Sequence, residues 1–165
     1  PPPHGAQYTA YLAGELSRNT ANAVDICGSA VFAEDEVFYL DGYETQLCNL
    51  LSGEMKRISL VLDGRAAAIQ LKCAPRLSVR LPESPEEPPV IRVRAAVRCD
   101  EADAGKYVDA LRQDVASLLI KCQQWGADPV GFCERARMRV WTLMDWEALD
   151  WPELYRKAVF EIDIR

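Results

Sequence analysis

Histidine is almost absent from this 165-residue sequence, which contains a single one, His4. Serine and cysteine hydrolases need an imidazole base within hydrogen-bond reach of the nucleophile, so their mechanisms are excluded unless a partner chain supplies the base. Metal sites that depend on histidine ligands are excluded in the same way. We therefore expect a protein that is not an enzyme, with no catalytic residues, no metal and no cofactor.

Phosphate-binding motifs are also missing, since neither G-x-G-x-x-G nor G-x-x-x-x-G-K-[ST] occurs. Gly126 and Gly131 have the outer spacing of the second motif, but the Lys-Ser/Thr pair that would contact phosphate is absent. Two acidic clusters, Glu34–Glu36 and Glu83–Glu87, lack the spacing of a calcium loop and are interpreted as solvated turns. Two carboxylates for sugar hydrolysis stay open as an alternative, because such a pair can be far apart in sequence.

No two cysteines have the C-x-x-C spacing that zinc and redox sites use. The cysteines stand beside apolar residues, as in Ile26-Cys27 and Phe132-Cys133. Cysteine in such a context is usually a small core residue. We expect this role, rather than metal or redox chemistry, for all six: Cys27, Cys48, Cys73, Cys99, Cys122 and Cys133.

Two further absences concern partners. The formal net charge is −6, so no overall positive field attracts nucleic acid. No hydrophobic run approaches the roughly 18 residues of a membrane span. Pro1–Gly5 lacks the basic start and the apolar core of a signal peptide. We expect a soluble chain with no nucleic-acid partner.

What is present is the composition of a globular domain, with 49% hydrophobic and 27% charged residues. Residues 1–24 are expected to form a short helix and a linker left from a preceding domain, and residues 25–165 to form one domain. The strongest local signal is Asp63-Gly64 between two apolar segments, which predicts a β-hairpin.

Arginine dominates the polar face of the expected strands. Apolar residues alternate along residues 66–81 and again along residues 91–99, which indicates an antiparallel sheet covered on one face. The positions between them hold Arg76, Arg80, Arg92, Arg94 and Arg98. Two interpretations are open: a solvated face whose charges pair across strands, or a docking surface for an acidic partner or an anionic ligand.

The last third of the chain has helical spacing, with a helix that stops at Gly126. Asp128 is expected to cap a second helix, with Pro129 at its first position. The tryptophans at 125, 141, 146 and 151 are interpreted as core and helix-packing residues. Residues 158–165 alternate again and return to the sheet. The predicted fold class is α+β, a twisted antiparallel β-sheet with long helices packed on one face.

Two segments together resemble one bacterial protein family. The first contains Gly28, Val31, Phe32, Asp41 and Gly42 and is similar to a pattern G-x-A-V-F followed by L-D-G-x-E-T. The second contains Asp128, Gly131, Phe132, Trp141 and Trp146 before the closing strand, and is similar to the ending of the same family. In this order, the two patterns are typical of the C-terminal domain of the spore germinant-receptor C subunit, the Ger(x)C family. The resemblance covers residues 25–165.

The resemblance implies a non-enzymatic role in nutrient-triggered spore germination. Members of the family are lipoproteins on the outer surface of the inner spore membrane, held by an N-terminal lipid anchor that is absent from this chain. They work beside two membrane subunits, A and B, so this domain would act by protein–protein contact. A small-ligand (germinant) binding domain is the alternative. Cys133 and the loop at residues 82–89 depart from the family pattern, and an extracytoplasmic location would leave a disulfide open.

Overall fold

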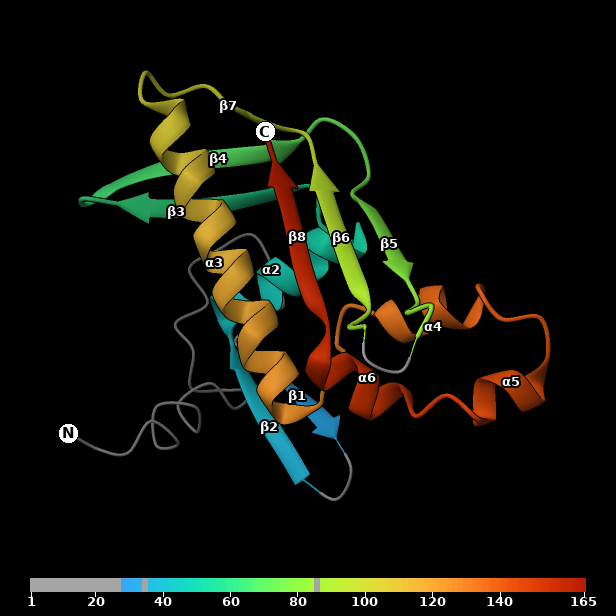
Figure 1. Ribbon diagram of the computed structural model, residues 1–165. Coiled ribbons are helices and arrows are strands. Elements are labelled where there is room, and N and C mark those ends of the chain that lie inside the picture. The colour runs from blue at the N-terminus through green and yellow to red at the C-terminus, as the bar shows by residue number, and fades with distance from the viewer. Residues whose placement is uncertain (1–27, 34–35, 85–86) are drawn as a thin grey trace.

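The computed structural model describes residues 28–33, 36–84 and 87–165. The described residues form eight strands and five helices, which confirms the predicted α+β class (Figure 1). The strands do not form one sheet, as the alternation predicted, but three small ones, ordered β1-β2, β3-β4-β7 and β5-β6-β8. The predicted helix and linker at residues 1–24 lie outside the described residues.

The central hairpin is the one that the sequence predicted. Strands β3 (Arg57–Leu62) and β4 (Arg65–Leu71) pair antiparallel, with Leu62 opposite Arg65. Asp63 and Gly64 both have positive φ angles, 51° and 75°. Such angles fit the two-residue hairpin turns that follow the right-handed twist of the strands.

The long alternating segments each break where the chain passes from one sheet to the next. The first divides into β4 and β5 (Arg76–Arg80), and the second into β6 (Val90–Ala95) and β7 (Val97–Cys99) at Ala96. β7 pairs with β4, whereas β6 pairs with β5. Pro75 contributes to the first break, because proline has no N–H to donate to a ladder.

The closing strand β8 (Val159–Ile164) pairs with β6 in parallel, although an antiparallel sheet was predicted. The reason lies in the connection, because the chain between β6 and β8 contains a helical crossover that returns it to the end at which β6 began. Alternation of apolar residues reports which face is buried but not the direction of the strand.

The first family segment forms a hairpin and a capped helix. Strands β1 (Gly28–Ala33) and β2 (Glu36–Asp41) precede helix α2 (Gly42–Ser52). The Asp41 carboxylate accepts the N–H of Glu44 at 2.8 Å, and the Glu44 side chain accepts the N–H of Asp41 at 3.0 Å. This capping box satisfies two donors that the helix start would otherwise leave free, which explains why Asp41-Gly42 marks the boundary.

Helix α3 (Ala104–Trp125) connects the sheets, since it packs against β3, β7 and β8 (Figure 1). Its buried side holds Leu111, Val115, Leu118 and Cys122. The helix ends at Gly126, as predicted, with φ at 67°. The positive φ favours glycine there, and a Cβ on Gly126 would lie 2.8 Å from the Arg156 guanidinium, which would have to move.

Asp128 does not cap the next helix in the predicted way. Helix α4 (Phe132–Arg137) has Gly131 as its N-cap, so neither Asp128 nor Pro129 belongs to the helix start. The Asp128 carboxylate still reaches that start, because it accepts the N–H of Gly131 at 3.0 Å and of Cys133 at 2.6 Å. Burial raises the pKa of Asp128 and outweighs these hydrogen bonds, which lower it. The segment is a tight corner between two helices.

The chain returns to the sheet through helices α5 (Leu143–Glu147) and α6 (Trp151–Lys157). α6 leads directly into β8 and contributes Tyr155 and Trp151 to the core, where Tyr155 is stacked near Phe132 with ring centroids 6.4 Å apart. α5 is different, because none of its residues is buried. Figure 1 shows it at the outer end of an excursion that leaves the body of the domain.

Candidate interaction surface

Four of the five predicted arginines lie together on the outer face of the sheet β5-β6-β8. The strand register places Arg76 opposite Arg94, and Arg94 beside Asp163. The residues between them on each strand point into the core, so the four arginines share the outward side. We call this set, Arg76, Arg80, Arg92 and Arg94, the arginine face. Arg98 lies elsewhere, on β7 of another sheet, where it pairs with Asp100 at 2.7 Å.

The four arginines differ in their partners. Arg92 donates to Glu161 at 2.5 Å, and Arg80 donates to Glu87 at 2.8 Å. These pairs lower the pKa of both glutamates and raise that of Arg92, mainly through the hydrogen bonds. Within the described ranges, neither Arg76 nor Arg94 has an ion-pair partner. The face is therefore only partly neutralised.

Two hollows open on the arginine face. The first, of about 340 Å³, lies between Arg80, Arg92 and Arg139. The second, of about 200 Å³, lies where the strands pass between sheets, and we call it the joint hollow. It is lined by Arg76, Arg94, Asp163 and Arg165 around Ala74 and Ala96.

An apolar surface adjoins the first hollow. Met138, Trp141, Leu143 and Met144 are 76%, 99%, 58% and 80% exposed, and we call them the apolar segment. Trp141 was predicted to be a packing residue, and this is wrong. The segment begins next to Arg139 in the sequence, and Arg139 lines the first hollow together with Arg80 and Arg92.

The other tryptophans pack as predicted. Trp125 stacks on Phe38 with ring centroids 4.7 Å apart and an interplanar angle of 11°. Trp146 is half-buried against Trp151, which belongs to the core. No feature of the sequence around Trp141 distinguishes it from the other three tryptophans.

The first family segment also divides into packed and exposed residues. A Cβ on Gly28 would lie 2.6 Å from the carbonyl oxygen of Leu40, so only glycine fits there. Val31 packs against the core, whereas Phe32 is exposed. In the second segment Phe132 is fully buried.

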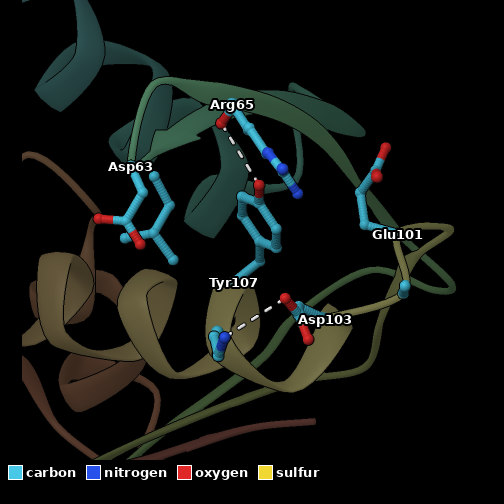
Figure 2. Close-up of a pocket in the computed structure, with 8 residues that line it drawn as sticks. Asp63, Arg65, Glu101, Asp103 and Tyr107 are labelled. Carbon is cyan, nitrogen blue, oxygen red and sulfur yellow. Dashed lines mark hydrogen bonds and ion pairs between the residues drawn. The ribbon is translucent and has the colours of Figure 1, made fainter.

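A third hollow, also of about 340 Å³, lies between the β3–β4 turn and the start of α3 (Figure 2). Its charges are mixed, and Lys106 already pairs with Asp103 at 3.3 Å. Figure 2 shows Asp63 and Glu101 at opposite ends of the group of side chains that lines it. The Tyr107 hydroxyl donates to the carbonyl oxygen of Arg65 at 3.3 Å.

The cysteines fit the predicted core role only in part. Cys48 and Cys122 are buried, and burial raises the pKa of each thiol to about 12. Cys73 is exposed, so the core prediction is wrong for it. All five cysteines in the described part of the chain are free, and Cys27 lies outside that part. Among the same residues, no group of three potential ligands could hold a metal ion.

The described helices include none with the length and hydrophobicity to cross a membrane. The fold defines a class: an α+β domain in which one long helix ties small sheets together and a final strand is added in parallel. No protein-family model and no curated protein matches the chain.

Among solved structures, the crystal structure of the GerBC protein matches with a TM-score of 0.56, covering 76% of this chain at 19% sequence identity. This chain spans 45% of the length of that protein. The α+β fold expected from the two family segments is therefore confirmed as similar to that of the GerBC protein.

Proposed function

We propose that this chain is a domain of a spore germinant-receptor C subunit, which works by protein contact and without catalysis. Two findings support the proposal: the GerBC-like fold, and the order of the two family segments at the ends of that fold. The full-length protein would be held by an N-terminal lipid anchor at the outer surface of the inner spore membrane. Its partners would be the membrane subunits A and B.

The observation that carries a contact function is the apolar segment beside the arginine face. Tryptophan, methionine and arginine are enriched where protein interfaces bind most strongly. Trp141 leaves 99% of its side chain in water, which is unfavourable for a large apolar group unless a partner covers it. The neighbouring arginines Arg80, Arg92 and Arg139 add a positive rim.

This composition specifies the partner surface: an apolar pocket that accepts Trp141 and Met144, bordered by carboxylates that face Arg80 and Arg139. The apolar part would supply most of the affinity, because the rim charges stay solvated. The charges would set orientation and the rate of association.

The test is co-purification of the full-length protein with the membrane subunits A and B. The double variant Trp141→Ser, Met144→Ser should weaken association by about tenfold or more. A matched control is Val61→Ser, because Val61 is 67% exposed on the distant β3 strand. Unchanged association of the double variant would contradict the proposed contact.

A second pair tests the charged rim. Arg80→Glu with Arg139→Glu should slow association and reverse its dependence on salt, whereas Arg57→Glu on β3 should not. If both charge variants behave alike, the rim has no role in docking.

A further inference from the structure

The joint hollow has features that the contact function does not use. Arg76 and Arg94 are directly opposite on an antiparallel pair, so their Cβ atoms are about 5 Å apart. Like charges in this position destabilise a sheet. The next outward-facing pair on the same strands has no such repulsion, because Arg92 stands opposite Ser78 and pairs with Glu161. Arg76 and Arg94 have neither a neutral residue opposite them nor an ion pair in the described part of the chain.

One carboxylate, that of Asp163, lines the hollow together with this pair. Asp163 is beside Arg94 in register, but its ion pair is with Arg165, at 3.7 Å. Three guanidinium groups and one side-chain carboxylate therefore line the hollow, and the charges of these four side chains sum to plus two. Guanidinium groups donate paired hydrogen bonds that match the oxygens of carboxylates and phosphates.

The backbone around the hollow is fixed before any ligand arrives. The N–H of Lys72 donates to Ala96 at 2.8 Å, and Arg165 accepts from Val97 at 2.8 Å and donates to Ala95 at 3.0 Å. These hydrogen bonds hold the backbone of residues 95–97, where the chain passes from β6 to β7 beside the hollow. Ala74 and Ala96 keep its centre open, since their side chains are a single methyl group. A backbone that is already fixed removes one part of the entropy that binding costs.

We propose that the joint hollow is a binding site for a small, doubly charged oxyanion, a phosphate monoester or a dicarboxylate. Arg76 and Arg94 hold the anion from two sides, and Arg165, positioned by Asp163, closes the third side. The volume of about 200 Å³ suits a ligand of a few heavy atoms rather than a peptide. The site is independent of the contact with other subunits, which uses Trp141, Met144, Arg80 and Arg139.

The probes are inorganic phosphate and succinate, added to this 165-residue chain at constant ionic strength. At about ten times the dissociation constant, the melting temperature should rise by roughly 3–6 °C. The tighter of the two probes identifies the ligand class. Arg94→Gln should abolish the rise, and Arg98→Gln, which changes an exposed arginine of another sheet, should preserve it.

Arg76→Gln provides the same test through the opposite strand, should Arg94→Gln fail to fold by circular dichroism. Amide chemical shifts of Val93–Ala96 should move with phosphate in the wild-type chain and stay fixed in either variant. No rise with either probe at about 50 mM, or an equal rise in wild type and in the folded glutamine variants, overturns the proposal. Because no partner subunit is present, this result is separate from the outcome of the co-purification.

Discussion

Arg76 on β5 and Arg94 on β6 lie directly opposite each other, and no carboxylate in the described ranges forms an ion pair with either. The next row holds Arg92 with Glu161 at 2.5 Å. One face of a single sheet therefore combines a neutralised row and an unneutralised one. Solvent and salt are what moderate the repulsion between Arg76 and Arg94 in the free domain.

Replacing Arg76 should therefore stabilise the domain at low salt. We expect Arg76→Thr to raise the free energy of unfolding by about 0.2–1 kcal/mol, measured by urea denaturation. The gain should shrink toward zero near 1 M NaCl, because screening removes the repulsion. Arg57→Thr on β3 is the matched control, since Arg57 stands opposite Gln70. A gain that is unaffected by salt would show that repulsion is not its cause.

Two glycines at opposite ends of helix α3, Gly105 in its first turn and Gly126 just after its last residue, should respond oppositely to alanine. Gly126 has φ at 67°, and a Cβ there would lie 2.8 Å from the Arg156 side chain. Gly126→Ala should therefore cost about 1 kcal/mol or more. Gly105 is helical with no atom within 4 Å of an added Cβ, so Gly105→Ala should stabilise by about 0.5–1 kcal/mol. Thermal unfolding of the two variants decides, and a shift in the same direction would contradict the prediction.

Phe132 and Trp141 belong to one family segment, but their replacement by alanine should change the free energy of unfolding by very different amounts. Phe132 is fully buried between Tyr155 and Phe160, so Phe132→Ala should lower the free energy of unfolding by about 3–5 kcal/mol. Trp141→Ala should change it by less than about 0.5 kcal/mol, because the side chain is almost entirely in solvent. A large loss of stability in Trp141→Ala would assign this residue to packing instead of contact.

Local features of the fold could be predicted from the sequence. The Asp63-Gly64 hairpin and the Gly126 stop each depend on a few neighbouring residues whose conformational preferences are strong. The four arginines on one face also followed from alternation, because a strand exposes every second residue.

Features that depend on the path of the chain could not be predicted. The break at Ala96 is set by hydrogen bonds from Lys72 and Arg165, which are distant in sequence. The parallel entry of β8 is set by the helical crossover before it. Trp141 lies just before α5, in an excursion whose helix has no buried residue, whereas composition alone favours burial of tryptophan.

Asp128 gives the domain a pH dependence with a defined sign. Burial raises its pKa, so the native state holds a proton at pH values where the unfolded chain has released it. Its contribution to stability is therefore greatest below the unfolded pKa and declines as the pH rises through the folded pKa. The stability of wild type relative to Asp128→Asn, measured by urea unfolding between about pH 4 and pH 7, should fall as the pH increases.

Glu161 supplies a control of opposite sign. Its hydrogen bond from Arg92 lowers its pKa, so its contribution is present above the unfolded pKa and is lost as the pH falls through the folded one. The stability of wild type relative to Glu161→Gln should therefore fall on acidification. Because each comparison subtracts the titration of all other groups, the two differences should slope in opposite directions. Parallel slopes would mean that the buried corner at Asp128 does not favour the neutral carboxyl group.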